Sequence, residues 1–175
     1  TVERPTLSTE ASDGLDGDKR VIASRRSTVT DVATYAGLIP GRDYPMRGGL
    51  HLRDAEGADA GPLRDAAGIP VTAELAFTPE ASDGSVALAF DFDSVALAGR
   101  DLVIFESLYR EEALIASHAD IADENQAVSV VPSTLMTRAR DSADGDKSVA
   151  PAEGVAVADR IVARDVVPGE NYSIV

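Results

Sequence analysis

An internal repeat constrains this chain more than any other feature of its sequence. The segment "TEASDGLDGDK" at 9–19 returns as "TRARDSADGDK" at 137–147, an offset of 128 residues. The same offset relates further residues without a gap: Asp31 and Asp159, Pro40 and Pro168, Gly41 and Gly169, Tyr44 and Tyr172. Self-similarity at one fixed period is typical of a chain built from successive copies of one unit. We therefore predict a complete unit over 1–131 and the start of a second, truncated copy over 132–175.

The chain is acidic and contains no cysteine. Its net charge is −14 over 175 residues. Such a surface repels phosphate, which argues against binding to nucleic acid or to an anionic membrane. The 44% of hydrophobic residues indicates a folded protein. The absence of cysteine excludes disulfides and thiolate metal sites. We expect no cofactor and no metal.

The hydrophobic pattern predicts strands. The runs "VTAELAFTP" (71–79), "SVALAFDFD" (85–93) and "DLVIFESLY" (101–109) partly alternate, and glycine or proline separates them. The remaining predicted strands are 27–35, 44–52, 113–117 and 126–131. No segment shows a sustained helical stripe. Several short strands at roughly even spacing favour an all-β domain, an antiparallel β-sandwich of immunoglobulin type.

Few side chains near these strands are suited to chemistry. Glu106 lies in the apolar run "LVIFESLY", where a carboxylate is costly to bury unless it is protonated or paired. The stretch "HADIADENQ" contains His118 and Gln126, the only glutamine of the chain. Thr9 opens the repeated segment, and Asp31 begins the apolar run "DVATY". Each of these residues also has an ordinary structural role, so none identifies a site alone.

Four segments together resemble the Thr–Gln (T-Q) ester-bond domains, also called VaFE repeats, of Gram-positive cell-surface adhesins. They are "TEASD" (9–13), "TVTDVATYAGLIPGRDY" (28–44), "LAFTPEASDGSVALAFDFDSVALAGRDLVIFESLY" (75–109) and "SHADIADENQAVSV" (117–130). The last is the most specific, because the family pattern has a histidine eight residues before a glutamine. The resemblance implies a CnaB-type immunoglobulin-like sandwich. It also implies an intramolecular ester between Thr9 and Gln126, with Asp31, Glu106 and His118 as the catalytic groups.

These roles are chemically reasonable. A threonine hydroxyl is a weak nucleophile and needs a base within hydrogen-bond reach, a task that suits the imidazole of His118. Two carboxyls in one apolar site cannot both ionise easily, so the Asp31–Glu106 pair is expected to keep a proton and to donate a hydrogen bond to the Gln126 carbonyl. Ammonia leaves and an ester remains. This is a single autocatalytic turnover, so the protein is not expected to be an enzyme.

The resemblance further implies a biological setting. The chain is expected to be a stalk repeat of a cell-wall-anchored bacterial adhesin, extracellular and on the cell surface. The ester would provide mechanical, thermal and proteolytic stability. The expected partners are neighbouring repeats of the same polypeptide, with the host ligand bound by a different domain.

Three alternatives stay open. An isopeptide crosslink would need Lys19 or Lys147, and both lie in polar "DGDK" turns where burial is not expected. Calcium would use the carboxylates of "DGLDGDK" or "HADIADEN". A plain ligand-binding sandwich would have no crosslink. Under the ester hypothesis, the acidic residues between His118 and Gln126 are expected to be mostly turn and solvent-facing.

Overall fold

The computed structural model describes residues 4–174 of the chain. The chain folds into two compact units, Thr1–Val131 and Pro132–Val175, and each is described separately.

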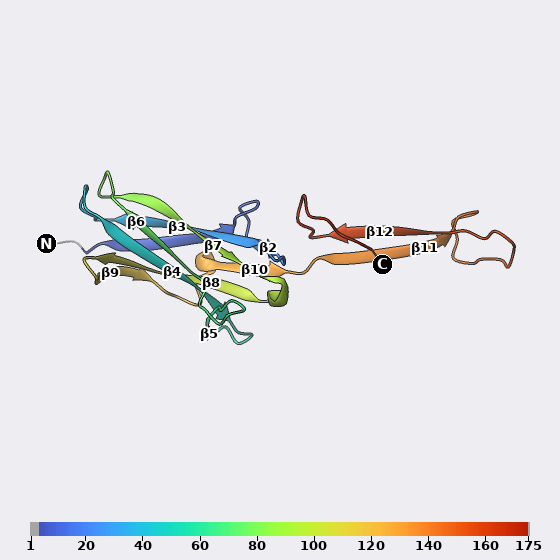
Figure 1. Cartoon of the computed structure of the whole chain (residues 1–175), viewed down its shortest axis with the longest axis horizontal. Helices are drawn as coiled ribbons and strands as arrows, with labels where there is room; N and C mark the ends of the chain where they lie inside the picture. Colours follow the sequence, from blue (N-terminus) through green and yellow to red (C-terminus); the bar gives the residue numbers. More distant parts are fainter. Residues whose placement is uncertain (1–3, 175) are drawn as a thin grey trace. The chain divides into compact units, whose positions relative to one another are not determined.

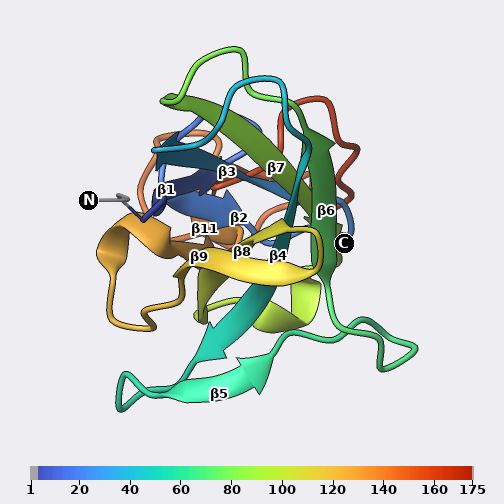
Figure 2. The ribbon, with the colours of Figure 1, turned by 90° about the vertical axis from the view of Figure 1, so that its left-hand side faces the viewer.

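The first unit contains two β-sheets that face each other (Figures 1 and 2). The three-stranded sheet has the order β1 (Thr6–Asp13), β3 (Ser27–Ala36), β7 (Gly84–Phe92). The seven-stranded sheet has the order β2 (Arg20–Ile22), β10 (Ala127–Val131), β8 (Asp101–Arg110), β4 (Tyr44–Arg53), β5 (Asp59–Pro62), with β6 (Thr72–Phe77) on β4 and β9 (Ala113–His118) on β8. Neighbouring strands are antiparallel except β2 and β10, which are parallel. Two 3-10 turns complete the unit: η1 (Val95–Leu97) and η2 (Glu124–Gln126).

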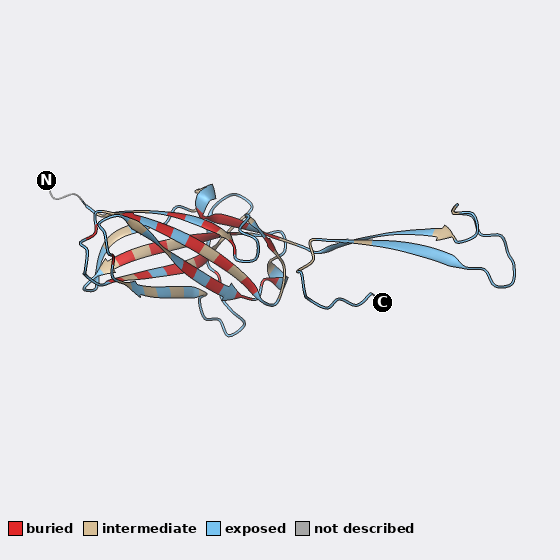
Figure 3. Cartoon of the chain, turned by 90° about the horizontal axis from the view of Figure 1, so that it is seen from above, coloured by how far each residue is buried: buried red, intermediate tan, exposed pale blue. Residues whose placement is uncertain are grey.

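The core lies between the two sheets, where alternate side chains of each strand point inward. Figure 3 shows this alternation as bands of buried residues along the strands of the first unit. Tyr44, Phe90 and Ile104 are all at most 1% exposed. Gly48 of β4 permits the packing of Phe90, because a Cβ at position 48 would lie 2.6 Å from the Phe90 Cζ. Packing therefore requires glycine at position 48, the first glycine of "RGG" (47–49).

The second unit contains one antiparallel strand pair, β11 (Thr134–Asp141) and β12 (Val157–Arg164). No described residue of this unit, from 132 to 174, is buried (Figure 3). A two-stranded sheet without a hydrophobic face against a core is marginally stable in water.

Each of the seven predicted strands is observed within two residues of its predicted ends, and the all-β class is confirmed. The prediction missed β1, β2 and β5 in the first unit and both strands of the second. Among residues 4–174, no helix has the length and apolar character needed to cross a membrane.

Candidate crosslinking site

Strand register brings four of the predicted site residues to the interior, two from each sheet. In the three-stranded sheet Ala11 pairs with Asp31, and Thr9 lies two residues before Ala11. Thr9 and Asp31 are therefore diagonal neighbours on one face. In the seven-stranded sheet Glu106 of β8 lies directly opposite His118 of β9. Thr9 is 5% exposed, and Asp31 and Glu106 are 0% exposed. The space between the sheets thus collects the polar groups that the sequence distributes over more than a hundred positions.

The alternation of β1 selects which hydroxyl enters this space. Thr9 and Ala11 are buried, whereas their neighbours Ser8 and Glu10 lie on the opposite face and are less buried. A strand turns successive side chains to opposite faces. Thr9, and not Ser8, is therefore the hydroxyl that faces the site.

Gln126 ends η2, directly before β10, and is fully buried. Its Nε2 donates to the backbone carbonyls of Ile104, at 2.7 Å, and His118, at 3.1 Å. Its Oε1 accepts from the backbone N–H of Asp120 at 3.2 Å. Hydrogen bonds at both ends hold the carboxamide in one orientation.

A hydrogen bond and an ion-pair contact connect Thr9 to a carboxylate through His118. Thr9 Oγ1 lies 3.1 Å from His118 Nδ1, and His118 Nε2 lies 3.1 Å from Asp123 Oδ2. The other oxygen of Asp123 caps η2 by accepting from Asn125 N–H at 2.9 Å. When the imidazole proton is on Nε2, the nitrogen that faces Asp123, Nδ1 is free to accept the Thr9 hydroxyl proton. This arrangement has the roles of a nucleophile–base–carboxylate triad.

Asp123 corrects one expectation. The acidic residues between His118 and Gln126 were predicted to be mostly turn and solvent-facing. Asp123 is an exception, because its side chain is only 22% exposed and its Oδ2 lies 3.1 Å from the imidazole Nε2. The residue is five positions from His118 along the chain. The turn between them folds it back onto the ring, with Asp123 N–H donating to the Asp120 carbonyl at 3.1 Å.

Asp31 and Glu106 form a buried carboxyl pair. None of their four oxygens has a hydrogen-bond partner elsewhere in the described chain. Burial, together with the neighbouring charge of Asp31, raises the pKa of Glu106 to about 9. Burial also raises the pKa of Asp31 to about 6, against the lowering effects of Glu106, Lys19 and His118. Near neutral pH the pair therefore holds one proton and one negative charge.

The carboxyl pair was predicted to donate to the Gln126 carbonyl, and the structure differs. That oxygen accepts from the backbone of Asp120, and the two carboxyls make no hydrogen bond to Gln126. The reason is local. The turn that follows His118 wraps around the carboxamide and presents a backbone N–H to it.

The side chain of Lys19 was expected to remain unburied, and the structure differs. Its side chain is half-buried, and Nζ donates to the backbone carbonyls of Ala11, at 2.5 Å, and Asn125, at 2.7 Å. An isopeptide needs the amine on a side-chain carboxyl or carboxamide. The two acceptors here are backbone groups.

The "DGLDGDK" turn brings three carboxylates together, those of Asp13, Asp16 and Asp18, with ligand oxygens within 4.8 Å of one another. These are the ligands that calcium prefers. The turn is also organised by its own bonds, since Asp16 Oδ1 accepts from Asp18 N–H at 3.1 Å and Asp18 Oδ1 from Arg20 N–H at 2.5 Å. Two carboxylates of "HADIADEN" have other partners: Asp123 pairs with His118 at 3.1 Å, and Glu124 pairs with Arg53 at 2.7 Å.

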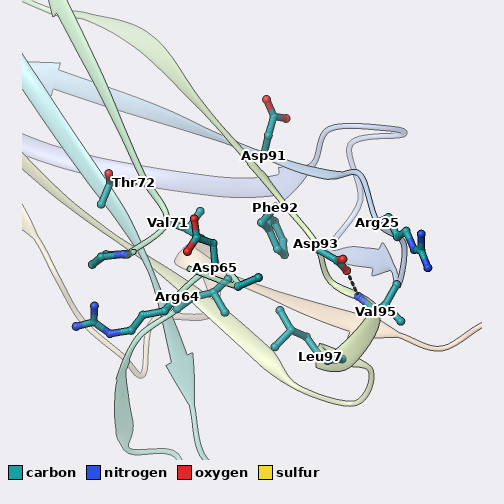
Figure 4. Close-up of a pocket in the computed structure, with 14 residues that line it drawn as sticks. Arg25, Arg64, Asp65, Val71, Thr72, Asp91, Phe92, Asp93, Val95 and Leu97 are labelled. Atoms are coloured by element: carbon teal, nitrogen blue, oxygen red, sulfur yellow. Dashed lines mark hydrogen bonds between the residues drawn. The ribbon is translucent and has the colours of Figure 1, made fainter. Parts of the chain in front are cut away.

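A cleft of about 620 Å³ lies elsewhere in the first unit, between the β5–β6 connection and the end of β7 (Figure 4). Charged side chains of both signs rim it, including Arg25, Arg64, Asp65 and Asp93, and Phe92 and Leu97 line it. None of the five predicted site residues lines this cleft. The candidate crosslinking residues therefore lie away from this cleft.

Comparisons with known proteins agree with this fold. Two solved structures of a bacterial adhesin from Mobiluncus mulieris, described as containing intramolecular disulfide, isopeptide and ester bond cross-links, have TM-scores of 0.59 and 0.56 to this chain. They are 13% and 12% identical to it, and the alignments cover 92% of this chain and 76% and 77% of theirs. At that identity the likeness concerns the fold, and it confirms the predicted immunoglobulin-like sandwich. No curated protein matches the sequence.

A family model described as the T-Q ester bond containing domain matches residues 5–130 and, separately, residues 133–175. The two matches cover nearly the whole chain and follow the internal repeat. The chain therefore belongs to the T-Q ester bond containing domain family.

Proposed function

We propose that the first unit crosslinks itself through an ester between Thr9 Oγ1 and Gln126 Cδ. The observation that carries the proposal is the Thr9–His118 hydrogen bond, with Asp123 against the other imidazole nitrogen and with a fully buried Gln126 that donates to the His118 carbonyl. The Thr9 hydroxyl contacts the imidazole and the Gln126 amide contacts the His118 carbonyl, inside a sandwich whose family is named for this bond.

The first step forms the new bond. His118 Nδ1 removes the proton of the Thr9 hydroxyl, and Oγ1 attacks Gln126 Cδ. The carbonyl π electrons move to Oε1, and the Asp120 N–H that already bonds this atom stabilises the oxyanion. Asp123 stabilises the imidazolium that forms at His118.

The second step breaks the C–N bond. The oxyanion collapses, the Cδ–Nε2 bond breaks, and the proton held by His118 passes to the leaving nitrogen, which departs as ammonia. Hydroxyl plus carboxamide thus becomes ester plus ammonia, with no other reactant. The role we assign to the Asp31–Glu106 pair is electrostatic, because its single negative charge favours the imidazolium between the two steps.

The fold supplies the rate and preserves the product. Holding the two groups in place replaces an encounter between separate molecules, an effect worth several powers of ten. Burial of Thr9 and Gln126 keeps water from the ester after it forms. The reaction runs once in each molecule, so the protein acts on itself and has no turnover.

The position of the bond supports a structural role. Thr9 lies on β1, where the unit begins, and Gln126 lies directly before β10, its last strand. A covalent link between these strands resists separation when the two ends are pulled. It also closes a loop of nearly the whole unit, which stabilises it by about 4–5 kcal/mol in the chain-entropy model.

We therefore infer a stalk repeat of a cell-wall-anchored bacterial surface adhesin. The adhesin description of the two Mobiluncus structures and the sequence repeat support this inference. Neighbouring repeats of the same polypeptide are its direct partners, and a different domain binds the host ligand. The separate family match of residues 133–175 supports the assignment of the second copy to the same kind of repeat.

Intact mass spectrometry tests the crosslink. The folded protein is expected to weigh one ammonia less than its sequence, and hydroxylamine under denaturing conditions should open the ester. A Lys–Asn isopeptide also loses one ammonia but resists hydroxylamine, so resistance would favour that alternative. A full linear mass would reject both.

A further inference from the structure

Lys19 connects three segments of the candidate site. Its backbone carbonyl accepts from Ser129 N–H of β10 at 2.8 Å. Its ammonium donates to Ala11 O of β1 at 2.5 Å and to Asn125 O of η2 at 2.7 Å. One residue therefore joins the first strand, the turn that carries the glutamine and the last strand.

The two carbonyls held by this ammonium lie close in sequence to the reacting residues. Ala11 is two residues after Thr9 on the same face of β1, and Asn125 directly precedes Gln126. Both acceptors are backbone atoms of regular elements, so a change in either bond moves the neighbouring reacting residue. A displacement of about 1 Å at a reacting group is enough to cost on the order of 100-fold in rate.

The positive charge of Lys19 also acts on the carboxyl pair. It is among the influences that lower the pKa of Asp31 against the effect of burial. The other groups that face Asp31 are Glu106 of β8, His118 of β9 and Thr9 of β1. Lys19 is the only lysine or arginine in this set.

We propose that Lys19 is a positioning residue for ester formation, which holds the Thr9 strand against the Gln126 turn through its bonds to Ala11 and Asn125. This inference rests on the proposed function of the site. An ordinary structural role, in which the lysine only satisfies two carbonyls, would affect stability and leave the pH dependence of the reaction unchanged.

The repeat provides a matched control. Lys147 occupies the same place in the second "DGDK" segment and is exposed. Lys147→Met therefore makes the same chemical change outside the site. Lys19→Met removes the charge at similar length, and Lys19→Arg keeps it.

The experiment follows loss of ammonia over time. Linear protein, isolated in denaturant after brief expression, is diluted into buffers from pH 5 to pH 10 and sampled by intact mass spectrometry. Lys19→Met is expected to slow the reaction on the order of 10-fold to 100-fold. It should also move the acid limb of the pH–rate profile to higher pH, because Asp31 loses a neighbouring positive charge. Lys19→Arg should restore the position of that limb, and Lys147→Met should behave as the parent.

Two results overturn the inference: Lys19→Met reacting at the parent rate, or slowing equally at every pH. Circular dichroism checks that each variant folds. If Lys19→Met does not fold, Lys19→Arg provides the test. An acid limb that moves in Lys19→Arg, although the positive charge is retained, contradicts the proposal. A parent protein that never loses ammonia instead rejects the ester itself, so the two failures are distinguishable.

Discussion

Two strand pairs in this chain, β1–β3 and β11–β12, share one pairing register and differ in their surroundings. In the first unit Ala11 of β1 pairs with Asp31 of β3. In the second, Ala139 of β11 pairs with Asp159 of β12, the same register moved by one repeat. The pairing is therefore encoded within the short repeated segments and does not require the rest of the domain.

The burial of these residues and the chemistry proposed for them do require the rest of the domain. Thr9 and Asp31 are buried between two sheets, whereas Thr137 and Asp159 are exposed. Residues 132–175 contain no histidine and no glutamine, so a base of the His118 type and an amide electrophile of the Gln126 type are both missing there. A threonine becomes a nucleophile through its surroundings, and the second copy shows the same threonine without them.

The largest expected difference between the two copies comes from removing each hydroxyl. Thr9→Val keeps the branched shape and should abolish the loss of ammonia completely, with a fall of about 4–5 kcal/mol in the free energy of unfolding. Thr137→Val should change neither the loss of ammonia nor the free energy of unfolding. Intact mass and thermal unfolding measure both effects. A Thr9→Val protein that still lacks one ammonia would exclude Thr9 as the nucleophile.

Hydrogen exchange compares the two strand pairs directly. Amides of β1 and β3 are paired above a packed core, and those of β11 and β12 belong to a sheet without buried residues among positions 132–174. The second pair should exchange several orders of magnitude faster, because its opening costs little free energy. Equal protection in both pairs would show that the second unit has a stabilising contact of its own.

The two histidines provide a third comparison. His118→Ala removes the base and should slow crosslinking about 100-fold to 10,000-fold. His51 also bonds an aspartate, Asp59, at 3.0 Å, but lies on β4 away from the site. His51→Ala should crosslink at the parent rate. Equal rates for the two variants would remove His118 from the mechanism.

A smaller effect is expected in the pH dependence of stability. Burial and the neighbouring Asp31 raise the pKa of Glu106 from 4.5 to about 9, and we expect the linear Thr9→Val protein to keep this shift. The folded state then binds a proton that the unfolded state has lost, so stability is highest at low pH and falls as pH rises through this window. Glu106→Gln should flatten that slope, measured by urea unfolding from pH 4.5 to pH 9. Asp159→Asn, at an exposed position, should leave it intact, and an unchanged slope in Glu106→Gln would contradict the buried-proton account.

The strands that sequence could predict are those with apolar inward faces. The run 101–109 is recognisable because Leu102, Ile104 and Leu108 are all core residues. In contrast, β1 turns Thr9 and Asp13 inward, so polar residues occupy its buried face and remove the hydrophobic alternation. The polar residues proposed for the site therefore removed the pattern by which the other strands were predicted.

The site was only partly predictable for a similar reason. Thr9, Asp31, Glu106, His118 and Gln126 were found through a family pattern, and register places four of them between the sheets, with Gln126 at the end of η2. The family pattern did not predict the contributions of Asp123, the Asp120 N–H and Lys19. Their contributions depend on how two turns fold back, and acidic or lysine-containing turns look alike in sequence whether they face solvent or a site.

Peptide mapping tests the central claim most directly. Trypsin should release Thr9 in a peptide that ends at Lys19 and Gln126 in the peptide 111–138, because no lysine or arginine lies between Arg110 and Arg138. The account predicts one branched species that joins these two peptides, lacks one ammonia and separates with hydroxylamine. Recovery of both peptides in linear form, with the Gln126 carboxamide intact, would contradict it.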